Sequence, residues 1–270
     1  MQKNNQPSTI NHQPKLLIIA GSDSGGGAGI QGDIKTACAH GVYASTAITA
    51  LTAQNTQGVS GIFDVSANFV AEQISLVLED IGADAIKLGM LNNAGVISAI
   101  EHVIGNLEIP IVLDTVMVAK GGALLLKTNA VNGLKSKLIP LAKIVTPNLP
   151  EAEILSGIKI RTLEDMIKAG HIILELGCHA VLVKGGHLWS SVIYDVVITR
   201  NKYEVFQQDK IDTPHTHGTG CALATAIACH LANGLDIFTA VDYARQYVFN
   251  AIQTAPGFGR GHGPINHFIK

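Results

Sequence analysis

The 270-residue chain has few charged residues and almost no net charge. Asp, Glu, Lys and Arg make up 15% of the residues, and the formal charge is −2. A surface of this kind does not attract polyanions, which argues against nucleic acid and anionic membranes as partners. No apolar run is long enough to span a bilayer. The length suits one large domain.

The chain also lacks the features of a secreted protein. Its four cysteines form no CxxC pair, and a chain of this length does not need disulfides to fold, so we expect reduced thiols and a cytoplasmic protein. Residues 1–13 are polar and lack the apolar core of a signal peptide. We expect a loose tail over 1–13, followed by one domain over 14–270.

Two common nucleotide-binding motifs are missing. No GxxxxGK run followed by Ser or Thr occurs, so there is no P-loop. The GAGIQG run at 27–32 has the letters of the dinucleotide fingerprint, but no Asp or Glu lies between Asp33 and Asp64 to hold a ribose. This argues against a dinucleotide-dependent oxidoreductase. The Gly-rich loop at 21–29 is then either a turn that lets a helix pack close to a strand or a ligand loop.

Short β-branched runs alternate with longer stretches of helical period. This alternation predicts crossover connections and a central, mostly parallel sheet flanked by helices, an α/β fold. A hairpin is predicted near 194–206, two helices near 221–233 and 236–253, and further strands within 43–65. The predicted strands are Leu16–Ala20, Ala85–Leu88, Ile109–Leu113, Lys143–Val145, Ala180–Val183 and Val192–Ile198, and the predicted helices include Val70–Asp80, Val131–Leu138, Leu163–Leu176 and Ala222–Ala232.

Polar residues follow several of these strands. They are Ser22 and Asp23, Asp114, Asn148, and Lys184. Ligands of open α/β sheets bind at the carboxyl ends of the strands, so a site is expected there.

The run His217-Gly218-Thr219-Gly220-Cys221 precedes a helix of small residues. We expect the backbone N–H groups of 218–221 to be free at the helix start and to bind an anion. The helix start should also lower the pKa of the Cys221 thiol, whose thiolate could accept a proton from a substrate hydroxyl. The alternatives are a buried cysteine in a tight turn and a metal site formed with His215 and His217, which lacks a second cluster of zinc-like spacing.

Taken together, the motifs of this chain resemble one family. In order they are GSDSGGGAGIQGDIKT, ITALTAQNTQGV, KLGML, LDTVMVAKGG, TPNLPEAEIL, VLVKGGH and HGTGCALATAIA. The series, over about residues 15–265, resembles the hydroxymethylpyrimidine/phosphomethylpyrimidine kinases of thiamine biosynthesis, in the ribokinase-like superfamily. The resemblance implies a three-layer sandwich, a homodimer, and ATP-dependent phosphorylation of 4-amino-5-hydroxymethyl-2-methylpyrimidine and then of its monophosphate.

The resemblance also implies roles for single residues. Gln54 would read the pyrimidine edge, because an amide offers both a donor and an acceptor. The rest of the substrate pocket would be Gly21, Asp33, Met90 and Val116. Met90 and Val116 could equally be core residues, and Asp33 a solvated helix residue.

On the nucleotide side, the resemblance implies that Asp114 and Glu151 hold Mg²⁺, partly through water. Asn148 and Glu151 would order the phosphates of ATP, and Lys184 would contact them as a compact charge. Asn148 and Glu151 could instead only cap a helix. The catalytic group would be Gly218, Thr219, Gly220 and Cys221.

The chain departs from the family pattern in three places. It has Ser24-Gly25 where the family has Pro-Ser, Pro214-His215 where Lys-Asn is frequent, and Gly121 and Ala123 where Ser and Asp are usual. Many superfamily members also carry Asp at the position of Cys221. We interpret the cysteine as a way to avoid a fixed carboxylate beside a second acceptor that is already a phosphate.

Two other functions fit the same motifs. A pyridoxal kinase is the nearest rival, because the pyridoxal ring also bears a hydroxymethyl group. A non-catalytic pyrimidine sensor belongs to another class, but it should have lost the anion-binding turn or the metal-binding acids, and this chain keeps both.

Overall fold

The computed structural model describes residues 13–117, 130–186 and 191–269. Within them, nine strands form one sheet in the order β3-β2-β1-β4-β5-β6-β7-β8-β9. The pairs from β2 to β7 are parallel, and β3, β8 and β9 pair antiparallel at the two ends. The strands are β1 Lys15–Asp23, β2 Tyr43–Asn55, β3 Gly58–Asp64, β4 Ala85–Leu88, β5 Ile111–Leu113, β6 Ile144–Val145, β7 Ala180–Lys184, β8 Val192–Thr199 and β9 Tyr203–Asp209.

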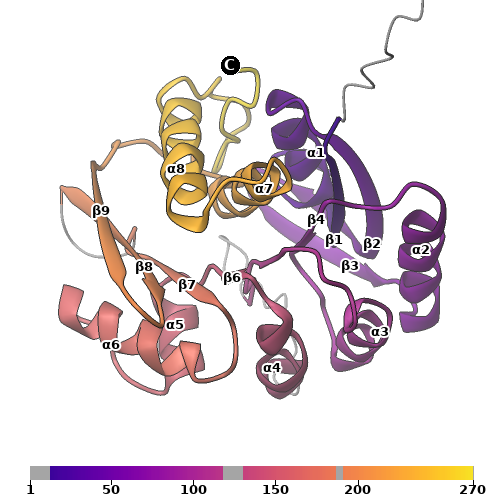
Figure 1. Cartoon of the computed structure of the whole chain (residues 1–270). Helices are drawn as coiled ribbons and strands as arrows, with labels where there is room; N and C mark the ends of the chain where they lie inside the picture. Colours follow the sequence, from indigo (N-terminus) through magenta and orange to yellow (C-terminus); the bar gives the residue numbers. More distant parts are fainter. Residues whose placement is uncertain (1–12, 118–129, 187–190, 270) are drawn as a thin grey trace, which may run out of the picture.

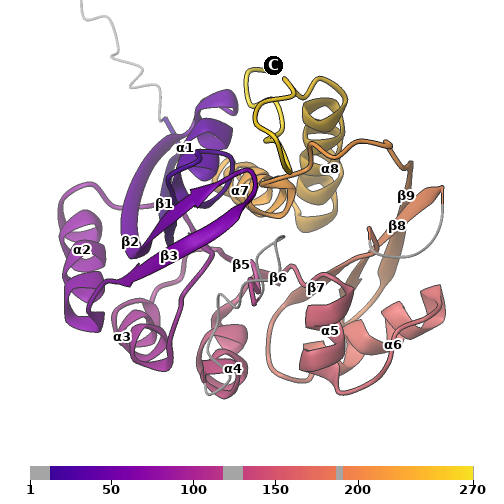
Figure 2. The same ribbon diagram turned by 180° about the vertical axis from the view of Figure 1, so that it is seen from behind.

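Helices cover both faces of this sheet, as Figures 1 and 2 show. Helices α1, α7 and α8 lie on one face, and α2 to α6 on the other. The predicted three-layer α/β sandwich is thus confirmed. The helices are α1 Gly29–Ala39, α2 Ala67–Asp80, α3 Ala94–Ile104, α4 Ala130–Gly133, α5 Leu149–Ser156, α6 Leu163–Leu174, α7 Thr219–Ala232 and α8 Ile237–Gln253.

The two faces follow from side-chain alternation along each strand. In β1, Leu16 and Ile18 pack in the core under α1, α7 and α8, whereas Leu17 and Ile19 pack in the core on the other face. All four are buried, so the strand reads as a continuous apolar run, as parallel strands between two helix layers do.

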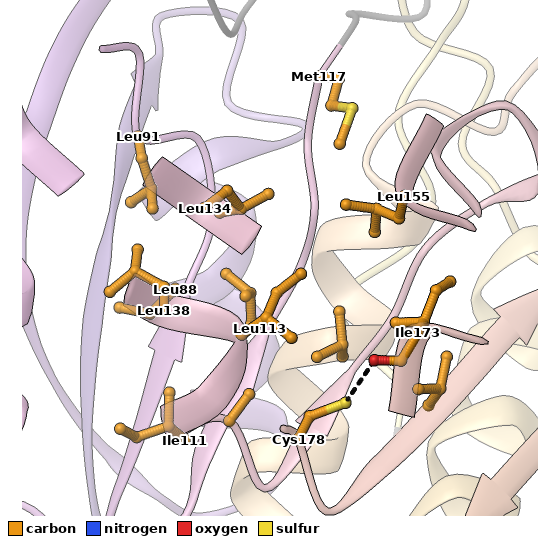
Figure 3. Close-up of a cluster of buried hydrophobic side chains, with 14 of the residues drawn as sticks. Leu88, Leu91, Ile111, Leu113, Met117, Leu134, Leu138, Leu155, Ile173 and Cys178 are labelled. Atoms are coloured by element: carbon orange, nitrogen blue, oxygen red, sulfur yellow. Dashed lines mark hydrogen bonds between the residues drawn. The ribbon is translucent and has the colours of Figure 1, made fainter. Parts of the chain in front are cut away.

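The second core lies between the sheet and α2 to α6. Figure 3 shows Leu88, Ile111 and Leu113 from adjacent strands facing helical side chains such as Leu155. In the same cluster the Cys178 thiol donates to the Ile173 carbonyl over 3.7 Å. Burial raises the pKa of this thiol to about 12, so it packs as an apolar group.

The predicted strands and helices are present, with one difference. The segment expected as a single helix over Val131–Leu138 is divided into α4, a π-helical turn at Leu134–Leu138 and a 3₁₀ turn at Ile139–Leu141. Gly133 lies directly before the π-helical turn, and Pro140 lies within the 3₁₀ turn. Gly and Pro are the two poorest helix formers. No helix of the described residues is long and apolar enough to cross a membrane. The expected tail over 1–13 lies almost wholly outside the described residues.

Candidate active site

A pocket opens at the carboxyl ends of the parallel strands and faces the start of α7. Every predicted site residue lines it, with Asp33 as the exception. The lining residues are Ala20, Gly21, Ser22, Asp23, Ala28, Gly29, Thr52, Gln54, Lys87, Met90, Asp114, Val116, Asn148, Glu151, Lys184, Thr216, His217, Gly218, Thr219, Gly220 and Cys221.

Helix α7 begins at the pocket without a capping side chain. Gly218 precedes it with φ 85°, a left-handed conformation, and a Cβ there would overlap the carbonyl oxygen of Gly27. The N–H of Thr219 points back to the Thr216 carbonyl at 3.5 Å. Of the four N–H groups expected at the helix start, that of Thr219 thus turns back to the chain, and those of Gly218, Gly220 and Cys221 remain.

The Cys221 thiol is not the acidic thiol that its place at a helix start predicts. Burial raises its pKa to about 11, and the carboxylates of Asp33 and Asp114 act in the same direction. The Lys87 ammonium opposes them without reversing the shift. The expectation of a resting thiolate is therefore corrected: desolvation outweighs the helix dipole, and Cys221 is protonated at neutral pH.

Asp33 lies behind the pocket wall. Its carboxylate has no exposed surface and forms an ion pair of 2.7 Å with Lys87 Nζ, while Thr225 Oγ1 donates to it over 2.8 Å. The expected contact with substrate is thus corrected, and so is the alternative of a solvated residue. Burial alone would lower the pKa of Lys87, but Asp33 raises it above its ordinary value. Of the two residues in this ion pair, Lys87 from β4 is the one that lines the pocket.

Asp114 and Lys184 face the anion-binding turn from the ends of β5 and β7. Lys184 Nζ donates to Asp114 Oδ1 over 3.1 Å, and Thr146 Oγ1 to the same oxygen over 3.2 Å. A Cβ on Gly220 would lie 3.5 Å from Lys184 Nζ and 3.8 Å from Asp114 Oδ2. Burial acts to lower the pKa of Lys184, but Asp114 and then Glu151 raise it, so the ammonium is charged. A fixed cation therefore stands beside the helix start.

Glu151 and Asn148 form a capping box at the start of α5. Asn148 Oδ1 accepts from the Glu151 N–H over 3.0 Å, and Glu151 Oε2 accepts from the Asn148 N–H over 2.9 Å. Thr115 Oγ1 also donates to Oε2, over 2.9 Å. Burial raises the pKa of Glu151. Lys184 acts to lower this pKa, and Asp114 acts to raise it further. The capping interpretation is thus correct, and the same residues line the pocket.

The apolar wall of the pocket is closely fitted. A Cβ on Gly21 would lie 2.9 Å from the Met90 sulfur, so these two positions limit each other's size. Met90 is buried, and Val116, in the segment after β5, also lines the pocket. Gly29 has φ 55°, and a Cβ there would lie 3.0 Å from the Asp23 nitrogen. The Gly-rich loop therefore both packs closely and lines the pocket.

Two pairings join distant parts of the chain in ways that sequence reasoning missed. Besides Lys87 and Asp33, the His217 ring lies 2.8 Å from the Asp23 carboxylate and connects the first loop with the turn before α7. From the sequence, Asp23 is a polar residue after a strand, and His217 is part of a turn or of a metal site with His215. No spacing rule in the sequence marks either pairing. The departures at Gly121 and Ala123 lie outside the described residues.

The fold and the pocket define a class. An open helix start and a fixed lysine position phosphate groups and offset their charge, and two carboxylates beside them can hold a divalent cation, which is most of what phosphoryl transfer requires of a protein. The chain is a kinase with a ribokinase-like fold.

Comparison with known proteins identifies the family. The model of the phosphomethylpyrimidine kinase family matches residues 23–266. The hydroxymethylpyrimidine/phosphomethylpyrimidine kinase of Bacillus subtilis is 44% identical over 256 residues, 94% of each chain. The thiamine biosynthesis bifunctional protein ThiED of Geobacter sulfurreducens is 48% identical over 255 residues, and the chain spans 52% of that longer relative. The chain belongs to the phosphomethylpyrimidine kinase family.

A solved structure brings in a second activity. The ADP complex of Bacillus subtilis pyridoxal kinase superposes with a TM-score of 0.88 at 36% identity, covering 94% of this chain and 97% of that one. The fold is thus shared with a solved kinase that is named for pyridoxal.

Proposed function

We propose that this protein transfers the γ-phosphoryl group of ATP to 4-amino-5-hydroxymethyl-2-methylpyrimidine, and then phosphorylates the monophosphate to the diphosphate. The observation that carries the proposal is one pocket that holds both halves of the reaction. Gln54 and Met90 line its acceptor side, and the helix start of α7 faces Lys184 on the other.

The acceptor side suits a small heteroaromatic ring with a polar edge. Met90 and Val116 supply apolar walls, and the absence of a side chain at Gly21 lets the Met90 sulfur lie close to the backbone there. Gln54 supplies the donor and the acceptor that an aminopyrimidine edge needs. The hydroxymethyl group of such a ring would point toward Gly220 and Cys221.

The nucleotide side fits phosphates with a magnesium ion. Mg²⁺ is commonly held by one or two carboxylates together with substrate phosphates. No group of three or more potential ligand side chains occurs among the described residues, but Asp114 and Glu151 both line the pocket. Asp114 Oδ1 accepts a hydrogen bond from Lys184, and Asp114 Oδ2 lies near Gly220 in the turn. Mg²⁺ bound by these carboxylates would offset the negative charge of the phosphates.

The chain's own residues then position and stabilise the transfer. The N–H groups of Gly220 and Cys221 would hold the oxygens of the transferred phosphoryl group, and Lys184 would offset its charge. The acceptor hydroxyl keeps its proton until late in a loose transfer, so a protonated Cys221 can hydrogen-bond to it without first removing that proton. The sulfur could accept the hydroxyl proton only after the thiol had given up its own proton, and Lys87 lowers the cost of that thiolate.

The protein is further proposed to act as a homodimer in the cytoplasm. Strand β3 is an edge of the sheet, and it exposes Phe63 and Ile62 next to Leu51 of β2. Apolar side chains on an exposed edge favour pairing with a second copy. The four cysteines are free thiols, as a reducing compartment requires. Light scattering coupled to size exclusion measures the assembly.

One assay separates the proposal from its rivals. ADP release is measured with hydroxymethylpyrimidine, its monophosphate and pyridoxal in parallel. Turnover of both pyrimidines supports the proposal. Turnover of pyridoxal alone would show a pyridoxal kinase, the alternative that the superposition with the Bacillus subtilis pyridoxal kinase favours. Binding of the pyrimidine without ADP release would show a sensor.

A further inference from the structure

The carboxylate of Asp23 is held by donors on every side. Oδ1 accepts from the Gly25 N–H over 2.8 Å, and Oδ2 accepts from the N–H groups of Ala28 and Gly27 over 2.9 and 3.2 Å. The His217 Nε2 atom lies 2.8 Å from the same Oδ2. Burial acts to raise the pKa of Asp23, but the bonds from His217 and the backbone bring it below its ordinary value. An ionised carboxylate only accepts, so Nε2 of His217 must carry a hydrogen.

This hydrogen decides what His217 can do for Gln54. In the structure the Gln54 amide nitrogen, Nε2, lies 3.4 Å from His217 Nε2, which places a donor against a donor. A ring nitrogen that already carries a hydrogen cannot accept from an amide NH₂ group. The amide atom facing His217 should therefore be the carbonyl oxygen, which can share the hydrogen that His217 gives mainly to Asp23.

The other end of the amide leads to the same orientation. In the structure this end is the oxygen, Oε1, which lies 3.2 Å from Thr52 Oγ1, and Thr52 Oγ1 also lies 2.8 Å from the Ser22 carbonyl oxygen. The hydrogen-bond pattern around the amide requires it to be turned over, with Oε1 and Nε2 exchanged. A hydroxyl has one hydrogen, and the backbone carbonyl, which only accepts, takes it at the shorter distance. The amide atom facing Thr52 should then be the nitrogen, which donates to the hydroxyl oxygen. The O and N of an amide have the same shape, so the network assigns them.

We propose that Asp23 and Thr52, with His217 as the intermediate, fix the direction of the Gln54 amide, and that this direction sets which way round an aminopyrimidine lies in the pocket. The second half rests on the function proposed above. An aminopyrimidine edge carries a donor amino group beside an acceptor ring nitrogen, so it pairs with an amide only one way round. The amino group goes to the Gln54 oxygen, on the His217 side, and the ring nitrogen goes to the Gln54 nitrogen, on the Thr52 side.

The orientation of the aminopyrimidine matters because a ring turned over would carry its hydroxymethyl group away from the start of α7. A pyridine vitamer has no amino group beside its ring nitrogen, so it gains nothing from this orientation. Asp23, Thr52 and His217 are therefore positioning residues that favour the aminopyrimidine. They act through Gln54 and need not touch the reacting atoms.

The first test needs no substrate. A long-range ¹H–¹⁵N correlation spectrum of the full-length protein at neutral pH reports which ring nitrogen of His217 carries hydrogen. We expect Nε2 to be protonated, either in the neutral ring or in the imidazolium. A neutral ring protonated only at Nδ1 would overturn the proposal.

The second test uses a matched pair of variants at Thr52. Thr52→Val keeps the shape and removes the hydroxyl, and we expect KM for hydroxymethylpyrimidine to rise about tenfold with kcat and KM for ATP little changed. Thr52→Ser keeps the hydroxyl and should return KM to within about threefold of the wild-type value. The kcat/KM for pyridoxal, if measurable, should change less than that for the pyrimidine in Thr52→Val.

Equal losses in Thr52→Val and Thr52→Ser, or equal losses for both rings, would contradict the proposal. Thermal unfolding of both variants shows whether either fails to fold; if Thr52→Val does, the spectrum of His217 still decides. The proposed function fails separately, when the wild-type protein does not phosphorylate the pyrimidine at all.

Discussion

Replacing Asp33 with Asn removes the counter-charge of Lys87, whose side chain has no exposed surface. The pair is joined at 2.7 Å between Nζ and Oδ2, and the Asp33 carboxylate keeps the pKa of Lys87 raised despite burial. In Asp33→Asn a buried ammonium loses its only full negative partner at contact distance among the described residues. Breaking such a pair from one side costs about 3–5 kcal/mol. A domain is stable by only about 5–15 kcal/mol, so a large part of its stability should disappear.

The measurement is the free energy of unfolding from urea titration, with two comparison variants. Thr225→Val removes the 2.8 Å hydrogen bond to Asp33 without removing a charge, and should cost about 1–2 kcal/mol. The double variant Lys87→Met/Asp33→Asn removes both charges and should be more stable than Asp33→Asn alone. A loss below about 1 kcal/mol in Asp33→Asn, or a double variant no more stable than Asp33→Asn alone, would refute the reasoning.

Two further predictions concern titration and the acceptor phosphate. Burial lowers the pKa values of His230 and His267 to about 4, so both are neutral in the folded protein where the unfolded chain, with a pKa near 6.5, is protonated. Stability should thus be full above about pH 6.5 and fall toward pH 4, by up to about 2 kcal/mol at pH 5 for the buried His267 and by less for the partly exposed His230. His267→Phe should flatten this slope in urea titrations, and an unchanged slope contradicts the prediction. Cys221→Asp places a fixed charge near the second acceptor, and at ~4 Å like charges cost roughly 4 kcal/mol with an effective dielectric near 20. Its kcat/KM should therefore fall further for the monophosphate than for the alcohol, and equal losses in the two assays would count against the interpretation.

Much of the fold could be predicted because the buried strands differ plainly in composition from the helices around them. The run Leu16–Ala20 is apolar and β-branched, and it forms the middle of β1. The segment Ala85–Leu88, which is apolar apart from Lys87, is β4 from end to end. Polar residues at the ends of other parallel strands lie at the same edge of the sheet, as Asp114 after β5 and Lys184 at the end of β7 do. The sheet therefore brings them to one pocket.

The corrected features depend on what surrounds a residue in three dimensions. The helix start at Cys221 is visible in the sequence, but the degree of burial that raises its pKa is not. Asp33 was placed in the pocket by resemblance, and only the packing of α1 against β4 and α7 shows that it serves Lys87 and Thr225. The bond between Asp23 and His217 joins positions 194 residues apart.

One pocket is proposed to phosphorylate both the alcohol and its monophosphate. The most direct test is mass spectrometry of the products formed from purified hydroxymethylpyrimidine monophosphate, ATP and Mg²⁺. We expect the diphosphate in amounts equal to the ADP released. Release of ADP without the diphosphate, or no reaction of the monophosphate where the alcohol reacts, would contradict it.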